Sequence, residues 1–135
     1  MRRDPVTREV LDLIAGMSTR FYAEYDAAAQ AQDLTGVRAR LLTLLADGPA
    51  PMNQLAAALK CEPSNITGLV DRLAARGLVT REPSPTDRRV KLVSATRAGA
   101  QLSARVWSVL DFAAEPLSGL SDDERLVLRD LLRRI

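Results

Sequence analysis

The side chains best suited to chemistry in this chain occupy one short stretch, and their types suit hydrogen bonding to a surface. The stretch supplies Ser64, Asn65, Thr67, Gly68 and Arg72. Asn pairs with adenine edges, Ser and Thr hydroxyls bind base edges or phosphates, and arginine binds phosphate. The glycine allows the backbone to approach another surface closely. The set is therefore suited to contact a nucleic acid.

The same stretch, residues 62–76, has the spacing of an amphipathic helix. Its apolar residues recur at i, i+3, i+4 and i+7, and they are Ile66, Leu69, Val70 and Leu73. Pro63 suits the first helical position, and Gly77 can adopt the left-handed conformation that often follows a helix. The helix is expected to bury its apolar side and expose the polar set. Taken alone, this pattern also fits an ordinary surface helix.

A second group of charged residues lies on a loop between two predicted strands. Residues 78–82 and 90–94 are rich in β-branched residues and predict a hairpin. The charged residues at its tip and just beyond are Asp87, Arg88, Arg89 and Lys91. An arginine is attracted into a narrow minor groove by the groove's negative potential, and a lysine suits phosphate contact. For Arg88 and Arg89 the alternative is that each is a solvated loop charge.

The charge of the chain is unevenly distributed. From Ser64 to Arg97 there are seven basic and three acidic residues, a net charge of +4 in a chain whose total is +2. The remainder therefore carries −2. A basic middle on a slightly acidic body suits one polyanion-binding face.

The elements that position these residues follow from periodicity and capping. Helices are predicted over residues 6–32, 36–46, 52–59, 62–76, 97–116 and from 122 to near the end. Thr35 and Thr96 are suitable N-caps, and Ser121 with Glu124 forms a capping box. Two helices across a short turn form a helix-turn-helix, and the hairpin that follows makes it a winged helix. The expected fold is mainly α with a small β-hairpin wing.

The composition excludes several other classes of protein. With one cysteine, Cys61, and no histidine, neither an internal disulfide nor a zinc site can form. We find no nucleophile–base pair and no Gly-rich phosphate loop, so no enzyme, catalytic residue, metal or cofactor is expected. No apolar run approaches the ~20 residues of a membrane span, and no signal peptide is evident. We expect a cytoplasmic protein with no membrane partner, and Cys61 as a small buried hydrophobe.

Together these features resemble the MarR family of bacterial transcription regulators. The motifs that carry the resemblance are Leu55-Ala56, Leu59, Ser64 to Leu73, Gly77 to Val79, Pro85 to Arg89 and Thr96 to Gly99. The similarity covers roughly the whole chain and is densest between residues 55 and 99. Its most specific part is the Asp-Arg-Arg wing joined to the Val-Asp-Arg-Leu helix.

The resemblance implies a single MarR-type domain over residues 1–135. Its winged-helix DNA-binding core would span about 34–96, and its dimerisation helices about 5–32 and 97–135. The apolar stripes in both terminal segments are consistent with a homodimer, although the first helix would serve equally to wrap its own domain. The implied partner is double-stranded operator DNA, with repression usually relieved by a small-molecule effector.

The resemblance also implies where the DNA contacts lie. The start of the 62–76 helix would enter the major groove, and Arg89 would enter the minor groove, oriented by a charge-assisted hydrogen bond that it donates to Asp87. The residues expected to bind DNA are Ser64, Asn65, Thr67, Gly68, Arg72, Asp87, Arg88, Arg89 and Lys91. Two alternatives remain open, a bond from Thr67 back to its own helix and an ion pair for Arg72. Residues Phe21, Tyr22, Tyr25 and Trp107 are expected either to line an effector cleft or to lie in the core.

Three residues depart from the family pattern. Pro51 replaces a common Ser or Thr cap, Lys60 replaces a common Gly in a tight turn, and Ala95 replaces a common Leu. These changes affect local stability rather than the expected DNA contacts.

Two other functions remain, a constitutive architectural DNA-binding protein without an effector and a winged helix used only for protein contacts. The basic wing and polar helix face argue against the second.

Overall fold

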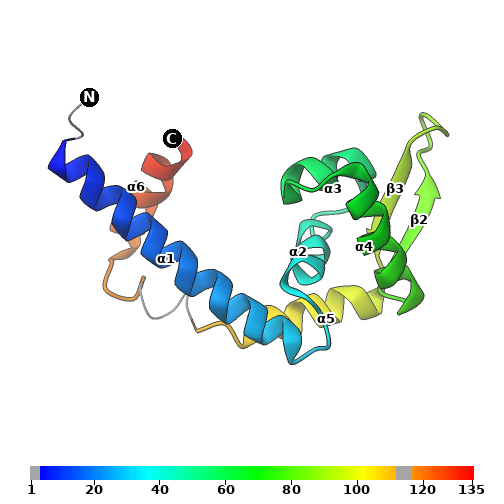
Figure 1. Cartoon of the computed structure of the whole chain (residues 1–135), viewed down its shortest axis with the longest axis horizontal. Helices are drawn as coiled ribbons and strands as arrows, with labels where there is room; N and C mark the ends of the chain where they lie inside the picture. Colours follow the sequence, from blue (N-terminus) through cyan, green and yellow to red (C-terminus); the bar gives the residue numbers. More distant parts are fainter. Residues whose placement is uncertain (1–3, 112–116) are drawn as a thin grey trace. The chain divides into compact units, whose positions relative to one another are not determined.

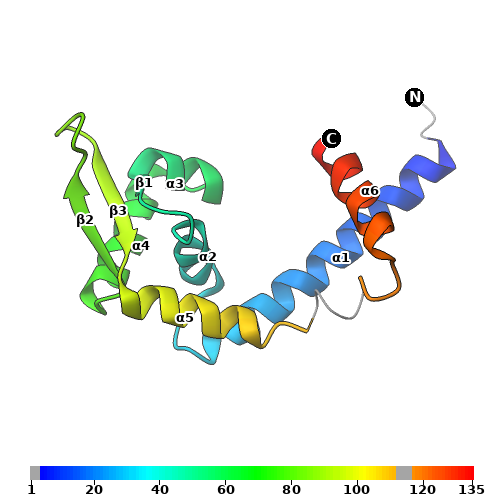
Figure 2. The ribbon, with the colours of Figure 1, turned by 180° about the vertical axis from the view of Figure 1, so that it is seen from behind.

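The computed structural model describes residues 4–111 and 117–135 of the chain, which divide into two units (Figures 1 and 2). The terminal unit comprises Met1–Glu24 and Leu110–Ile135, and the central unit comprises Tyr25–Val109. Helix α1 (Pro5–Gln30) contributes residues to both. The described residues are mostly helical, with one small antiparallel sheet, so the predicted fold class is confirmed.

The central unit contains the winged helix. After α1 come α2 (Gly36–Leu44), β1 (Ala50–Pro51), α3 (Met52–Leu59), α4 (Pro63–Ala75), β2 (Val79–Pro83), β3 (Lys91–Ala95) and α5 (Arg97–Ser108). The predicted helices and strands are present, and most of their ends lie within two residues of the prediction. The helix expected over 97–116 ends at Ser108, and residues 112–116 lie outside the described part of the chain.

Strand β1 is not among the strands predicted from the sequence. It pairs antiparallel with β3 through Ala50 and Val93, while β2 pairs with the other side of β3 through Val79 and Ala95. The strand order is therefore β1-β3-β2. A two-residue strand is too short to show alternation, and Pro51 is tolerated there because β1 is an edge strand.

The core of the central unit is built from one side of each helix together with the sheet. Its largest fully buried side chains are Tyr25, Leu41, Leu42, Leu55, Ile66, Val70, Leu73, Val93 and Val106. The inward residues expected for α3 and for α4 are buried, with the exception of Leu69. Leu69 is half-buried, because it lies at the flank of α4 that faces a hollow beside α2. The burial of the remaining three apolar residues holds the polar side of α4 outward.

Thr96 and Gly99 join α5 to the end of α4. The Thr96 hydroxyl donates to the Gly77 carbonyl at 2.6 Å and accepts from the Gly99 N–H at 3.1 Å. The Thr96 N–H donates to the Leu78 carbonyl at 3.0 Å. A Cβ atom on Gly99 would overlap that same carbonyl oxygen. This glycine is therefore required for close packing of α5 on the α4–β2 connection, a reason that its position in the sequence did not reveal.

Two of the departures from the family pattern have the predicted local effect. Pro51 makes no side-chain cap to α3, so that helix begins without one. Lys60 ends α3 in the left-handed conformation with φ 52°, where a residue with a Cβ is strained. By contrast, Thr35 caps α2 and Gly77 ends α4 with φ 72°, as predicted.

The terminal unit consists of the first part of α1 together with α6 (Asp122–Arg133). The predicted capping box is present, since Ser121 accepts from the Glu124 N–H at 3.2 Å and Glu124 accepts from the Ser121 N–H at 3.0 Å. The latter bond lowers the pKa of the exposed Glu124 carboxyl. None of the helices in the described residues is long and apolar enough to cross a membrane.

Much of the apolar surface of the terminal unit is exposed. The large exposed apolar residues of its two helices include Val6, Val10, Leu11, Leu13, Ile14, Met17, Leu126, Val127, Leu131 and Leu132. In the described part of the chain, α6 has no buried residue at all. Most of these side chains belong to the two apolar stripes expected from the sequence, whereas Leu11, Leu126 and Val127 lie outside those stripes.

Candidate nucleic-acid interface

The polar set predicted on α4 lies on its solvent-exposed side. Ser64, Asn65, Gly68 and Arg72 are all exposed, because Ile66, Val70 and Leu73 occupy the buried side of the same helix. Helix α4 begins at Pro63 without a side-chain cap. The helix therefore presents short hydrogen-bonding groups, an open glycine and one arginine along a single surface.

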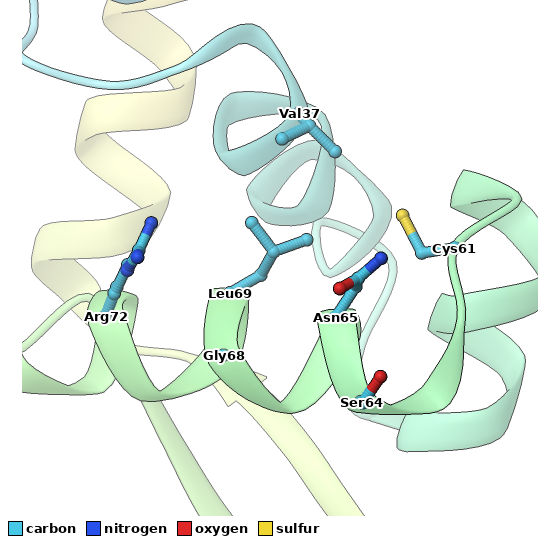
Figure 3. Close-up of a pocket in the computed structure, with 7 residues that line it drawn as sticks. All are labelled: Val37, Cys61, Ser64, Asn65, Gly68, Leu69 and Arg72. Carbon is cyan, nitrogen blue, oxygen red and sulfur yellow. The ribbon is translucent and has the colours of Figure 1, made fainter.

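Part of this surface borders a hollow of about 360 Å³ between α4 and α2 (Figure 3). Asn65, Leu69 and Arg72 project from α4 on the side where Val37 of α2 lies. Cys61, in the turn between α3 and α4, also lines the hollow. The expectation that Cys61 is buried is wrong: it is half-buried, since the turn places it at the rim.

The hydroxyl of Thr67 is used within its own helix. Its Oγ1 donates to the Pro63 carbonyl at 3.1 Å, which is the alternative that the sequence left open. The oxygen keeps acceptor capacity, so it can still accept a hydrogen bond from an amino group on a DNA base. As a donor, however, Thr67 is already engaged in this structure.

The arginines near α4 fall into two groups. Arg72 makes no hydrogen bond or ion pair with any other described residue, so the alternative of an ion pair is not realised. Arg81 is paired with Asp71, which ties β2 to α4, and Arg76 donates to the Asp33 carbonyl at 2.8 Å and the Gln32 carbonyl at 3.3 Å. Of these three arginines, Arg72 is the one available for a phosphate.

The tip of the wing is shaped by Asp87. Its carboxylate accepts from the backbone N–H of Arg89 at 3.0 Å, and its carbonyl accepts from the Val90 N–H at 3.0 Å. The Ser84 N–H in turn donates to the Val90 carbonyl at 2.8 Å. The hydrogen bond found for Asp87 therefore orients the Arg89 backbone and not, as the family resemblance implied, its guanidinium.

The wing carries its basic side chains outward. Arg88, Arg89 and Lys91 are exposed, and among the described residues none of the three has a hydrogen-bond or ion-pair partner. Arg89 and Lys91 also border a hollow of about 270 Å³ with Asn53 at the start of α3. Figures 1 and 2 show the hairpin of β2 and β3 lying alongside α4 in the central unit. The basic wing and the polar side of α4 thus belong to elements that pack together within the central unit.

The four aromatic residues expected at an effector cleft form two pairs. Phe21 and Tyr22 pack edge to face at 5.5 Å in the terminal unit. Tyr25 and Trp107 pack edge to face at 5.9 Å in the central unit. Tyr25 is a core residue, whereas Trp107 is 42% exposed and is therefore not.

Thr43 connects the second aromatic pair and was missed by sequence reasoning. The indole N–H of Trp107 donates to Thr43 Oγ1 at 3.0 Å, and the Tyr25 hydroxyl lies 2.9 Å from the same atom. Burial raises the pKa of Tyr25, while the Thr43 hydrogen bond and the charge of Arg40 oppose that shift. The one signal for this role in the sequence is that Thr43 places a hydroxyl among the leucines of α2.

Comparison of the sequence with known proteins matches it to one protein family and to a named repressor. A sequence model described as MarR family matches residues 32–90. The HTH-type transcriptional repressor NicR of Pseudomonas putida is 32% identical over 132 residues, covering 96% of this chain and 84% of NicR.

Solved structures match along nearly the whole chain. CouR from Rhodococcus jostii RHA1, determined bound to p-coumaroyl-CoA, is 28% identical with a TM-score of 0.79, covering 97% of this chain and 94% of CouR. The transcriptional regulator BldR from Sulfolobus solfataricus is 28% identical with a TM-score of 0.77, and the match covers 100% of both chains.

Proposed function

The chain belongs to the MarR family of transcription regulators, and we propose that it is a repressor that binds double-stranded operator DNA as a homodimer and releases it when a small-molecule effector binds. NicR, which matches nearly the full length of the chain, is itself a transcriptional repressor. CouR supports the effector, since its structure holds p-coumaroyl-CoA.

The observation that carries the proposed DNA binding is the availability of the polar and basic side chains in the central unit. Asn65 and Arg72 on α4, together with Arg88 and Arg89 on the wing, are exposed and make no side-chain hydrogen bond or ion pair with other described residues. A major groove of about 12 Å accepts a helix such as α4, which would read base edges there. The wing arginines would then reach the adjacent minor groove.

The domain organisation is part of the same proposal. Residues 1–135 would form a single MarR-type domain, with a DNA-binding core at about 34–96 and dimerisation helices at about 5–32 and 97–135. The exposed apolar residues of α1 and α6 support the assignment of the terminal helices to dimerisation. The whole of α5, in contrast, lies within the central unit.

The test is equilibrium binding to the duplex upstream of the protein's own gene and to a scrambled duplex, over a range of salt concentrations. We expect nanomolar binding to the first, much weaker binding to the second, and a steep salt dependence. Equal, weak binding to both duplexes would contradict sequence-specific recognition at this site and would favour a constitutive architectural role.

The substitution Arg89→Ala tests the wing. Loss of one groove or phosphate contact from each subunit of the proposed dimer should weaken operator binding about tenfold or more. It should also reduce the slope of log affinity against log salt by about 1.8, which is about 0.9 for each contact. Arg8→Ala is the matched control, because Arg8 is an exposed arginine on α1 in the terminal unit. If both variants bind the operator like the unmodified protein, the wing has no part in DNA binding.

A further inference from the structure

Arg76, the C-cap residue of α4, reaches the connection between α1 and α2, which spans residues 31–35. Its guanidinium donates to the Asp33 carbonyl at 2.8 Å and to the Gln32 carbonyl at 3.3 Å. These partners lie 43 and 44 positions away in the chain, within the same central unit. Among the described residues, no other side-chain hydrogen bond joins α4 or its C-cap residue to this connection.

The connection lacks its own donors for these two carbonyls. The N–H groups of Gln32 and Asp33 donate back to the last turn of α1, but no backbone N–H in the described part of the chain donates to the carbonyl of either residue. Asp33 also has φ 55°, a left-handed conformation that strains a residue with a Cβ. Because α1 has no basic residue in its last turn, α4 supplies the positive charge that suits the carboxyl end of a helix.

The form of the contact constrains direction as well as distance. A guanidinium holds its N–H donors in a fixed planar fork, so two carbonyls bound at once fix its orientation. Arg76 is exposed, and water could replace it at both carbonyls, so the bonds add little stability. Arg105 of α5 contacts the same connection differently, since its Nε donates to the Gln32 side chain at 3.4 Å and to neither carbonyl.

We propose that Arg76 is a positioning residue that holds α4 in a fixed orientation to the end of α1, and so sets which spacing of operator half-sites the dimer accepts. The inference rests on the proposed function, because it assigns Arg76 a part in operator binding by a homodimer. α1 runs from the terminal unit, where its exposed apolar residues are proposed to form the dimer, to this connection. Arg76 therefore joins the helix proposed to contact bases to the helix proposed to contact the partner.

The spacing of half-sites is sensitive to how firmly α4 is held. A dimer of this kind contacts two half-sites separated by a DNA turn of about 10–10.5 base pairs, or a multiple of it. One added base pair moves the second half-site by about 3.4 Å and rotates it by about 35° around the DNA axis. A firmly held α4 cannot follow both changes, whereas a loosely held one can. The ratio of affinities for differently spaced operators therefore measures the role of Arg76.

The first experiment measures binding to the duplex upstream of the protein's own gene and to two altered duplexes, with one base pair inserted or removed at the centre. The unmodified protein should bind the altered duplexes about tenfold or more weakly, and Arg76→Ala about threefold or less weakly. Arg76→Lys keeps the charge but not the fork and should give an intermediate ratio. Arg105→Ala is the matched control and should keep the full spacing preference, because Arg105 does not tie α4 to the connection.

The salt dependence distinguishes positioning from a direct contact of Arg76 with DNA. Loss of a phosphate contact would weaken binding to all three duplexes equally and would lower the slope of log affinity against log salt by about 0.9 for each subunit. Loss of positioning changes the ratio between the duplexes and leaves the slope unchanged. Uniform weakening with a reduced slope, a full spacing preference in Arg76→Ala, or an equal loss of preference in Arg105→Ala would overturn the inference.

A measurement without DNA tests the positioning separately. Cys61, just before α4, is the single cysteine of the chain and takes one spin label, and Ala27→Cys adds a second label at an exposed position on α1. Pulsed electron paramagnetic resonance, on labelled protein diluted with unlabelled protein, gives the distribution of distances between the two labels. This distribution should broaden in Arg76→Ala and stay narrow in Arg105→Ala.

The two measurements separate failure of the inference from failure of the proposed function. Equal widths of the distance distribution with and without Arg76→Ala would overturn the inference, whatever the protein does with DNA. If the distribution broadens but the unmodified protein binds operator and scrambled duplexes equally, the positioning of α4 by Arg76 stands and the proposed function fails.

Discussion

Single hydroxyl groups organise the interior of the central unit. Thr43 lies on α2, yet its Oγ1 contacts Tyr25 from α1 and Trp107 from α5. A buried hydroxyl is stable only when it is hydrogen-bonded, and one atom here serves several elements. Because residues in one network share their partners, substitutions among them are not expected to be additive.

The substitution Tyr25→Phe tests this network. It removes the hydroxyl that lies 2.9 Å from Thr43 Oγ1 and should lower the free energy of unfolding by about 1 kcal/mol. Tyr22→Phe is the control, since Tyr22 is 45% exposed, and it should stay within about 0.5 kcal/mol of the unmodified protein. Urea denaturation of the unmodified protein and the two variants measures both changes in the free energy of unfolding. Equal effects of the two substitutions would show that the Thr43 hydrogen bond contributes no net stability.

The same residue predicts an alkaline limit to stability. Burial raises the pKa of Tyr25 above its ordinary value of 10.0, so the folded protein holds the phenol proton more tightly than the unfolded chain. This stabilisation is fully present below pH 10 and is lost as pH rises through the raised pKa of the folded state. Unfolding curves across this range should show less of that loss in Tyr25→Phe. An identical pH dependence in both proteins would refute the assignment.

At the scale of elements, helix ends are set by nearby residues, whereas glycines inside helices differ in whether packing requires them. Gly99 is required for packing, because a Cβ there would overlap the Leu78 carbonyl. A Cβ on Gly16 in α1 or on Gly68 in α4 would have nothing within 4 Å. Neither of these two glycines therefore has a packing role among the described residues, and within the folded chain each weakens its helix.

Substituting these two glycines with alanine tests the proposed approach of α4 to DNA. Gly16→Ala and Gly68→Ala should each raise the free energy of unfolding by about 0.5–1 kcal/mol, since alanine loses less entropy in a helix. Only Gly68→Ala should weaken operator binding, because its methyl group stands on the surface proposed to face the major groove. If Gly68→Ala binds operator as tightly as Gly16→Ala, the glycine is a tolerated defect with no part in recognition.

At the scale of the whole molecule, the exposed apolar side chains of α1 and α6 indicate association. Soluble monomers rarely expose large contiguous apolar areas, and an amphipathic helix with an uncovered apolar side usually packs against a partner. The exposed residues on the two helices, such as Val10, Leu13 and Leu131, fit the homodimer that we propose.

The substitution Leu13→Glu tests that dimer. Leu13 is 61% exposed within the chain, so the change removes little packing from the monomer. In a dimer built on α1, it would bury a charge and should shift the protein to monomer at micromolar concentration, with reduced operator affinity. Ser18→Glu, at another exposed position on α1, is the control for added charge. Sedimentation equilibrium that shows the same association for Leu13→Glu as for the unmodified protein would exclude this part of α1 from the interface.

The sequence by itself determined the helices, their caps and the polar composition of α4. Thr35, Gly77 and the Ser121–Glu124 box act on backbone groups within a few residues, and the spacing of Ile66, Val70 and Leu73 follows from the helical period. Such features depend on local geometry, which is why a single sequence reveals them.

Only the tertiary structure decided which residues meet across the chain. Ala50 pairs with Val93, and Thr43 receives the indole N–H of Trp107, 64 residues away. The partial exposure of Cys61 likewise depends on neighbours from other helices. Periodicity records which side of an element faces inward, but not which element covers it. The polar and basic composition of the surface proposed to bind DNA could therefore be predicted from sequence, whereas the hydrogen bonds that converge on Thr43 could not.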